Sequence, residues 1–219
     1  MACRVVVILT LLSLISCRGR NTEISEPETV QIIEAVRQDS TFIFDGNSLG
    51  GWEITNFGPQ GPVSVSGGEI ILGMGDGCTG ITYTRNIPSI NYEISLEARR
   101  KEGNDFFCGL TFQVRDDFCT FIAGGWGGTT VGLSCINGKD AAENETTSSF
   151  VFEKGRWYLI RLLVTESKIE AWIDQEKVID FITRGKKLSI RPEVTLSRPL
   201  GIATWNTTAG VRNIRIRKL

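Results

Sequence analysis

The sequence predicts an all-β fold in which two antiparallel sheets pack as a sandwich. About a dozen short segments alternate between apolar and polar residues, and they recur about every 8–12 residues, the spacing typical of strands in a sandwich. The 219 residues include 24 glycines but only 6 prolines and 2 methionines, which suits many turns. After residue 40 the apolar residues show no helical period. A chain of this length is compatible with one such domain, and we assign it residues 41–219.

The clearest strand pair lies in residues 103–133. On one face of its first strand stand the apolar residues Phe106, Cys108, Leu110 and Phe112. The alternate face carries Phe107, Gly109, Thr111 and Gln113. Asp116 and Asp117 stand where a hairpin turn is expected, and this turn would place Phe112 opposite Cys119. The predicted sheet therefore has one buried face and one face that can contact a solvated ligand.

Further strands are predicted on both sides of this hairpin. Before it, the alternating segments are 42–44, 52–54, 63–66, 69–72, 81–83 and 91–100. After it, they are 157–165, 168–174, 178–182, 199–205 and 210–217. Gly67 and Gly68 supply a tight turn between two of these strands.

Charge and composition exclude several classes of function. The formal net charge is -1, so the chain has no basic field for nucleic acid. The sequence contains no histidine, which removes the commonest general base and the commonest metal ligand. We therefore predict no cofactor, no metal and no nucleic-acid partner.

Residues 1–16 predict a cleaved export signal. Arg4 supplies a positive charge, and the apolar run 5–14 is too short to span a bilayer as a helix. The sequence Leu-Ile-Ser before Cys17 resembles a bacterial lipobox, in which the cysteine is lipidated and becomes the first mature residue. An ordinary signal peptide with a chance cysteine is the alternative. Residues 17–40 are polar and predict a tether with a possible short helix.

Arg18 follows the lipobox cysteine. In bacterial lipoproteins a residue other than Asp at this position favours the outer membrane. We therefore expect an exported protein that faces the periplasm and contacts the membrane only through its lipid anchor.

Four cysteines belong to the domain, namely Cys78, Cys108, Cys119 and Cys135. An oxidising compartment permits disulfides among them. Cys108 and Cys119 would be offset by about four residues on adjacent strands, roughly 13 Å, which is too far for a bridge. Cys78 with Cys135 is the first pair to test, and four unpaired cysteines are the alternative.

Five motifs in order resemble one family. They are FIFDGNSLGGW at 42–52, GGEI at 67–70, GRWYLIR at 155–161, IEAWIDQEKV at 169–178 and VRNIRI at 211–216. Together they resemble the 3-keto-disaccharide hydrolase domain family, which is frequent in bacterial lipoproteins. The resemblance implies a concanavalin-like jelly roll that acts on 3-keto-glycosides in the periplasm.

The chain departs from this family at two places. Many members carry a histidine in a Gln-Asp-His-Gly run before the last strand, and residues 201–210 contain none. Members also tend to place an acid after the central hairpin, where residues 123–126 read Ala-Gly-Gly-Trp. Neither family residue carries over to this chain.

The outward positions of the middle strands are predicted to line one concave face that binds sugar. Aromatic rings stack on the apolar faces of sugars, and carboxylates, amides and guanidinium groups bond their hydroxyls. The catalytic candidates are Glu97, Glu193, Arg99 and Arg161. The substrate-binding candidates are Trp126, Trp172, Gln113, Thr111, Asn104, Asp105 and Glu170. The alternative is that Glu93, Glu97, Arg99 and Arg161 form a solvated salt-bridge lattice across the sheet.

The tryptophans and one acidic pair allow two interpretations each. Glycines on both sides of Trp126 leave its ring free as a sugar platform, although it could also plug one end of the sandwich. Trp52 and Trp157 are predicted in the core or at its ends, and Trp205 is left open. The Asn104–Asp105 pair could hold a hydroxyl or a calcium ion, but before a strand it more often forms a turn.

The resemblance suggests elimination from a 3-keto-glycoside, in which a base removes the proton at C2 and the aglycone leaves. Without histidine the base would be a carboxylate, Glu97 or Glu193 with a raised pKa, while Arg99 or Arg161 holds the enolate oxygen. Two alternatives remain open at this point. One is a non-catalytic carbohydrate-binding module, and the other is a structural envelope lipoprotein with a protein partner.

Overall fold

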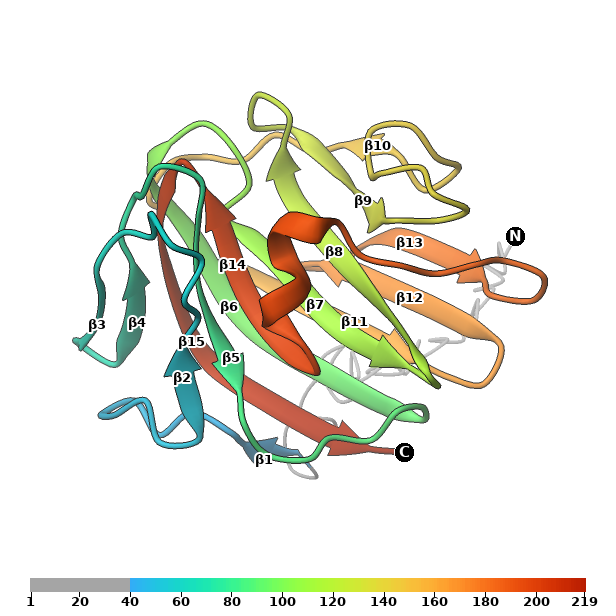
Figure 1. The fold of residues 1–219 in the computed structure, drawn as a ribbon, viewed down its shortest axis with the longest axis horizontal. Helices are drawn as coiled ribbons and strands as arrows, with labels where there is room; N and C mark the ends of the chain where they lie inside the picture. Colours follow the sequence, from blue (N-terminus) through green and yellow to red (C-terminus); the bar gives the residue numbers. More distant parts are fainter. Residues whose placement is uncertain (1–39) are drawn as a thin grey trace, which may run out of the picture. The chain divides into compact units, whose positions relative to one another are not determined.

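The computed structural model describes residues 40–219, which form two sheets packed face to face (Figure 1). Sheet A has eight strands: β1 (Thr41–Phe42), β3 (Val63–Ser66), β4 (Glu69–Leu72), β6 (Tyr92–Gly103), β11 (Tyr158–Val164), β12 (Lys168–Ile173), β13 (Glu176–Ile182) and β15 (Thr207–Lys218). Sheet B has seven: β2 (Trp52–Ile54), β5 (Cys78–Tyr83), β7 (Cys108–Val114), β8 (Asp117–Gly125), β9 (Thr130–Ser134), β10 (Ser148–Ser149) and β14 (Leu200–Trp205). The predicted antiparallel sandwich is confirmed.

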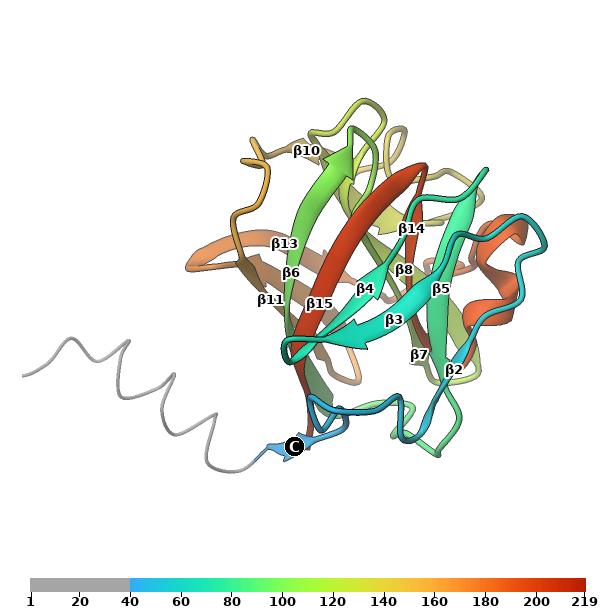
Figure 2. The ribbon, with the colours of Figure 1, turned by 90° about the vertical axis from the view of Figure 1, so that its left-hand side faces the viewer.

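Strands from distant parts of the chain lie side by side in each sheet. Sheet A runs in the order β13-β12-β11-β6-β15-β4-β3, with β1 paired to β15, and sheet B runs β10-β9-β8-β7-β14-β5-β2. Figure 2 shows these layers from the side. The chain passes between the sheets several times, and two of these crossings run from β6 to β7 and from β14 to β15. Both crossings bear directly on the candidate site.

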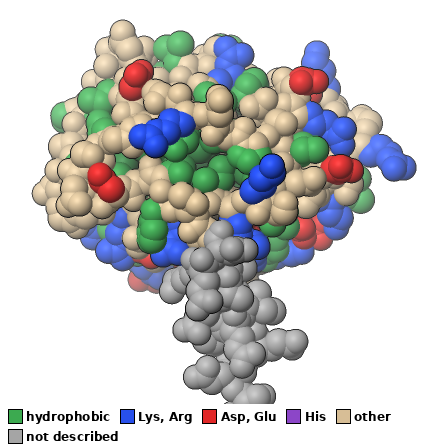
Figure 3. All heavy atoms as spheres, turned by 90° about the horizontal axis from the view of Figure 1, so that it is seen from below, with side chains coloured by type: hydrophobic (Ala, Val, Ile, Leu, Met, Phe, Trp, Pro, Cys, Tyr) green, Lys and Arg blue, Asp and Glu red, His purple; other side chains and the backbone are tan. Residues whose placement is uncertain are grey.

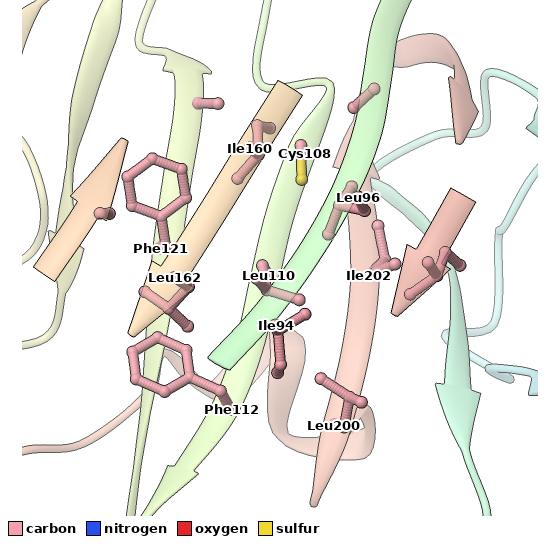
Figure 4. Packing of buried hydrophobic residues seen from close by; sticks show 14 of the residues in the cluster. Ile94, Leu96, Cys108, Leu110, Phe112, Phe121, Ile160, Leu162, Leu200 and Ile202 are labelled. Carbon is pink, nitrogen blue, oxygen red and sulfur yellow. The ribbon is translucent and has the colours of Figure 1, made fainter. Parts of the chain in front are cut away.

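The hydrophobic core fills the space between the sheets. Leu96 of β6 and Ile160 of β11 face Leu110 of β7 and Phe121 of β8, and all four are fully buried (Figure 4). Alternation at period two explains this, because every second residue of each strand points inward. The outward residues of the two sheets consequently lie on opposite faces of the molecule.

The central hairpin forms almost as predicted. Phe112 pairs with Cys119, and Cys108 pairs with Ala123, so the two cysteines are offset along the strands as expected. The turn is formed by Arg115 and Asp116, one residue earlier than predicted. Arg115 has a φ of 57°, the left-handed conformation that a two-residue turn of this kind requires.

The alternation fails just before β7. Phe107 is fully buried in the core next to Cys108, whereas the partly buried Phe106 belongs to a small outer cluster. The prediction for these two residues is therefore wrong. The reason is that β7 begins only at Cys108, so the crossing from sheet A does not keep the period of a strand.

Three elements were not predicted, namely β9, β10 and the 3₁₀ segment η1 (Pro192–Ser197). Gly201 of β14 allows η1 to lie close, because a Cβ there would stand 2.6 Å from both the Cβ and the carbonyl oxygen of Ser197. In Figure 2, η1 lies beside β5. This segment covers part of the outer face of sheet B.

The cysteines of the described residues are unpaired. Cys78, Cys108, Cys119 and Cys135 are all buried and free. The suggested bridge between Cys78 and Cys135 is not formed, and the alternative of four buried thiols describes the structure.

One end of the sandwich, with β1 and the C-terminus, presents hydrophobic side chains near its centre, and charged side chains of both signs surround them (Figure 3). The helical content of residues 40–219 includes no segment long and apolar enough to span a bilayer. The predicted export signal at residues 1–16, the predicted lipidation site Cys17 and the predicted tether up to residue 39 lie outside the described residues.

Candidate functional site

A hollow of about 170 Å³ lies on the outer face of sheet B. Outward side chains of the strands form its floor. Residues of the crossing before β7, of the β8–β9 loop and of the segment just before η1 form its walls. The lining residues are Cys78, Asp105, Phe106, Thr120, Ile122, Trp126, Ser134, Arg191, Glu193, Val194 and Trp205. Aromatic and aliphatic groups thus surround a few charged ones, as in many ligand sites.

Three of the predicted site residues meet in this hollow, namely Asp105, Trp126 and Glu193. Thr111 also faces outward from sheet B, but it is fully buried and shares a hydrogen bond with Thr120 at 3.0 Å. Gln113 donates to the carbonyl of Arg115 near the β7–β8 turn. Asn104, next to Asp105, is exposed and does not line the hollow.

The other predicted site residues lie on the outer face of sheet A. They are Glu93, Glu97, Arg99, Arg161, Glu170 and Trp172. The expectation that all candidates share one concave face is therefore wrong. Alternation indicates only whether a side chain points outward, and β6, β11 and β12 belong to the opposite sheet from β7 and β8.

The outward charges of sheet A form a lattice of ion pairs. Glu97 forms an ion pair with Arg212 at 2.7 Å, and Glu93 forms one with Arg161 at 3.2 Å. The guanidinium of Arg161 also lies 3.7 Å above the ring of Trp172. Glu69 accepts from Arg99 at 2.7 Å, and Glu170 pairs with Lys177 at 2.5 Å. The structure therefore favours the salt-bridge alternative for these residues.

Trp157 also lies in this lattice rather than in the core. The guanidinium groups of Arg99 and Arg212 stack on its ring, at 4.4 and 4.0 Å from the ring centre. The prediction for Trp157 is wrong, because β11 begins after it and Tyr158 takes the inward position. Trp52, in contrast, is buried as predicted and donates to the carbonyl of Ile43 at 2.8 Å.

Asp105 is held where the two crossings between the sheets meet. Its backbone N–H donates to the hydroxyl of Thr207 at 3.2 Å, and the backbone N–H of Trp205 donates to the carbonyl of Phe106 at 3.1 Å. The Asp105 carboxylate accepts the N–H of Phe106 at 2.7 Å. Within residues 40–219 no ion pair neutralises this carboxylate. Asp105 and Trp205 are thereby fixed on the same hollow.

Trp126 projects from a glycine-rich loop between β8 and β9. Its φ is 45°, and Gly124, Gly127 and Gly128 also have positive φ, which glycine adopts without steric cost. The indole is 43% exposed although it lines the hollow. It can therefore act as a platform for a ring that enters from solvent.

Arg191 organises the side of the hollow near η1. It donates two hydrogen bonds to Glu193, at 3.0 and 3.4 Å, and one to Asp140 at 3.0 Å. Hydrogen bonding to Arg191 lowers the pKa of Glu193 below its ordinary value. The expectation of a raised pKa for Glu193 is therefore wrong, and this carboxylate is ionised at neutral pH.

Cys78 contributes a nucleophilic side chain to the floor of the hollow, but its thiol is unreactive at neutral pH. Burial raises the pKa of its thiol to about 12, and the nearby charge of Glu193 acts in the same direction. Since the thiolate is the reactive form, Cys78 is a small apolar surface here.

Arg191 lines the hollow although the sequence did not predict it, and Trp205, whose place the sequence left undecided, lines it too. Arg191 precedes Pro192 and Glu193, and an Arg two residues from a candidate acid was the available signal. Trp205 ends β14 at a crossing that only the topology reveals. Across residues 40–219 no three cysteine or acidic side chains gather as a metal-binding cluster.

Comparison with known proteins agrees with this architecture. A model of the family described as 3-keto-alpha-glucoside-1,2-lyase-like domain matches residues 39–217. A proposed glycosyl hydrolase from Parabacteroides distasonis ATCC 8503 shares 18% identity with a TM-score of 0.57, over 85% of this chain and 96% of that chain. The chain's sequence matches no curated protein.

Two other solved structures share the fold. The carbohydrate binding module CBM66 from Bacillus subtilis has 15% identity and a TM-score of 0.52, over 81% of this chain and 100% of that chain. The Crh5 transglycosylase in complex with NAG has 14% identity and a TM-score of 0.59, over 82% and 84%. At these identities the likeness establishes the jelly-roll fold.

Proposed function

Because the chain belongs to the 3-keto-alpha-glucoside-1,2-lyase-like domain family, we propose that its hollow on sheet B binds a 3-keto-glucoside and eliminates the aglycone. The observation that carries this proposal is Asp105, whose carboxylate lines the hollow outside every ion pair of residues 40–219. Two indoles, Trp126 and Trp205, line the same hollow and suit the apolar faces of sugar rings. The resemblance seen in the sequence and the chemistry of this site point to the same class of ligand.

Asp105 is the proposed base. A ketone at C3 acidifies the C–H at C2, and the carboxylate takes that proton. The electron pair left at C2 forms the double bond to C1 as the bond from C1 to the aglycone oxygen breaks. The aglycone leaves as an alkoxide and takes a proton from water, and the hydroxide formed recovers the proton held by Asp105. Water addition to the resulting 1,2-ene would complete a net hydrolysis.

Arg191 is the proposed electrophile. A guanidinium has five N–H donors, and three of them are engaged by Glu193 and Asp140. The two that remain can donate to the C3 oxygen as negative charge develops there. The carboxylates of Glu193 and Asp140 fix the orientation of the guanidinium before the substrate arrives, which is the preorganisation that oxyanion stabilisation requires.

The second candidate function is a carbohydrate-binding module. It is favoured by the lowered pKa of Glu193, because an acid that stays ionised supplies no proton to a leaving group. In this case the hollow would bind a sugar between its indoles, and Asp105 would only accept hydrogen bonds from hydroxyls.

Release of nitrophenol from 4-nitrophenyl 3-keto-α-glucoside tests the proposal. Asp105→Asn is expected to lower kcat by about 100-fold or more, the contribution of a general base.

Trp126→Ala is expected to raise KM by about 3- to 10-fold with kcat little changed, since stacking is lost from ground and transition states alike. Glu193→Gln tests whether the other carboxylate is the base instead.

Glu97→Gln is the matched control. Because Glu97 lies on sheet A, this substitution should leave the rate unchanged. A second readout is exchange of the C2 proton with D₂O, which requires the base even when the aglycone leaves slowly. No release above the rate without protein, together with retained binding of unoxidised glycosides, would replace this proposal with the binding module.

A further inference from the structure

Arg100 is a buried cation of β6 that lies beneath one wall of the hollow. It is only 7% exposed, and no carboxylate within residues 40–219 forms an ion pair with it. Burial lowers the pKa of its guanidinium, while the charge of Asp105 acts in the opposite direction. A buried charge is costly unless it is compensated, so the groups that compensate Arg100 indicate its role.

The compensation comes from the loop that carries Trp126. One nitrogen of Arg100, Nη2, donates to the carbonyl of Gly128 at 2.8 Å and to that of Gly124 at 3.2 Å. The same guanidinium lies 5.3 Å from the ring of Phe107. Arg100 therefore joins the first and last residues of the five-residue stretch whose centre is Trp126.

The loop is shaped to receive this guanidinium. A Cβ on Gly124 would stand 2.4 Å from Nη2, and a Cβ on Gly128 would stand 3.1 Å from Nη1. The same Cβ on Gly128 would stand 3.0 Å from the carbonyl oxygen of Asn104, the residue before Asp105. With positive φ at Trp126 the loop adopts a conformation that an isolated chain rarely keeps. The hydrogen bonds from Arg100 to Gly124 and Gly128 are contacts that stabilise it.

We infer that Arg100 is a positioning residue that fixes the Trp126 platform beside Asp105. It donates to both ends of the Trp126 loop and lies under the crossing that bears Asp105, so one side chain sets the relation between the two walls of the hollow. The consequence for catalysis rests on the proposed function, whereas the positioning of the Trp126 loop by Arg100 does not. The alternative is that Arg100 merely fills the end of the core against Phe107 and Phe152.

The test uses the protein labelled with 5-fluorotryptophan and no ligand. The five tryptophans give five ¹⁹F resonances, and Trp126→Phe identifies the one from Trp126. Arg100→Lys keeps the charge but loses the planar fork, and Arg100→Met keeps much of the length without charge or donors. Both are expected to shift and sharpen the Trp126 resonance toward that of a freely moving indole, while those of Trp157 and Trp172 stay in place.

Two control variants distinguish a positioning role of Arg100 from a role in which it merely fills the end of the core. Leu162→Ala removes a buried core side chain of β11 and lowers stability without touching the loop, so the Trp126 resonance should not move. Arg156→Met removes an exposed arginine that stacks on Tyr158 at 4.5 Å, and should also leave it in place. If Arg100→Met does not fold, Gly128→Ala disturbs the same contact from the loop side.

Activity provides a second readout. If Asp105 and Trp126 act together on a 3-keto-glucoside, Arg100→Lys should lower kcat/KM by about 10- to 100-fold, as expected when reacting groups are misplaced by about 1 Å. A Trp126 resonance that stays fixed while stability falls would overturn the inference and leave Arg100 as a core residue. Absence of any lyase activity with a shifted resonance would refute the proposed function alone.

Discussion

Arg191 holds two carboxylates at once, and the titration of Glu193 depends on it. The Arg191→Met variant is expected to raise the pKa of Glu193 toward its ordinary value of 4.5, because the hydrogen bonds to the guanidinium are the largest cause of the lowered value. The pKa in the folded state lies below that in the unfolded state, so the pair stabilises the fold above the unfolded value and this contribution is lost as the pH falls through the folded value. A ¹³C NMR titration of the Glu193 carboxyl measures the change.

Glu145 supplies the control for this titration. Its pKa is lowered by Lys186, and it makes no contact with Arg191. Its titration should therefore be the same in both proteins. An unchanged midpoint for Glu193 in the variant would mean that Arg191 does not hold the carboxylate in solution.

The short 3₁₀ segment η1 depends on one glycine of β14. In a Gly201→Ala variant the new Cβ would stand 2.6 Å from Ser197, where backbone atoms cannot yield easily. We expect η1 to be displaced from β14 and the free energy of unfolding to fall by about 1–3 kcal/mol, the usual range for overpacking. Urea denaturation measures the loss.

Displacement of η1 would also move Glu193 and Arg191 at the edge of the hollow. Ala203→Gly, on the same strand, serves as a control that removes atoms rather than adding them. If the Gly201→Ala variant keeps both the stability and the ¹³C shift of the Glu193 carboxyl, the segment does not rest on this contact.

Elements with a strong period were predictable, and short irregular ones were not. The β7–β8 hairpin was predicted with Phe112 opposite Cys119, because both strands alternate and two polar residues mark the turn. The segment η1 spans Pro192–Ser197, and so short a 3₁₀ run has no apolar repeat to detect. Phe106 and Phe107 were exchanged because the chain there is a crossing and not a strand.

The whole molecule has two outer faces, and this division decided which site residues could be predicted. Sequence alternation identified outward residues such as Glu97 and Thr111 correctly, but it could not tell that β6 and β7 belong to different sheets. The hollow is assembled from separated parts of the chain, at residues 78, 105–106, 120–126, 134, 191–194 and 205. Asp105 and Trp126 were found through their local sequence, whereas Trp205 needed the three-dimensional arrangement.

The export signal that the sequence predicts in residues 1–16 leads to a prediction for the molecule as a whole. We propose that Cys17 is lipidated and that the domain is anchored to the bacterial envelope on the periplasmic side, on the basis of the lipobox-like sequence before it. Several acyl chains on one residue hold a protein at a membrane, because each buried CH₂ contributes about 0.8 kcal/mol.

In a Gram-negative host the full chain should incorporate labelled palmitate and sediment with the membranes, and Cys17→Ser should do neither. Cys3→Ser, which changes a cysteine of the signal segment away from the lipobox, should behave as the unaltered chain. Palmitate on the Cys17→Ser variant, or none on the unaltered chain, would leave an ordinary signal peptide as the explanation of this segment.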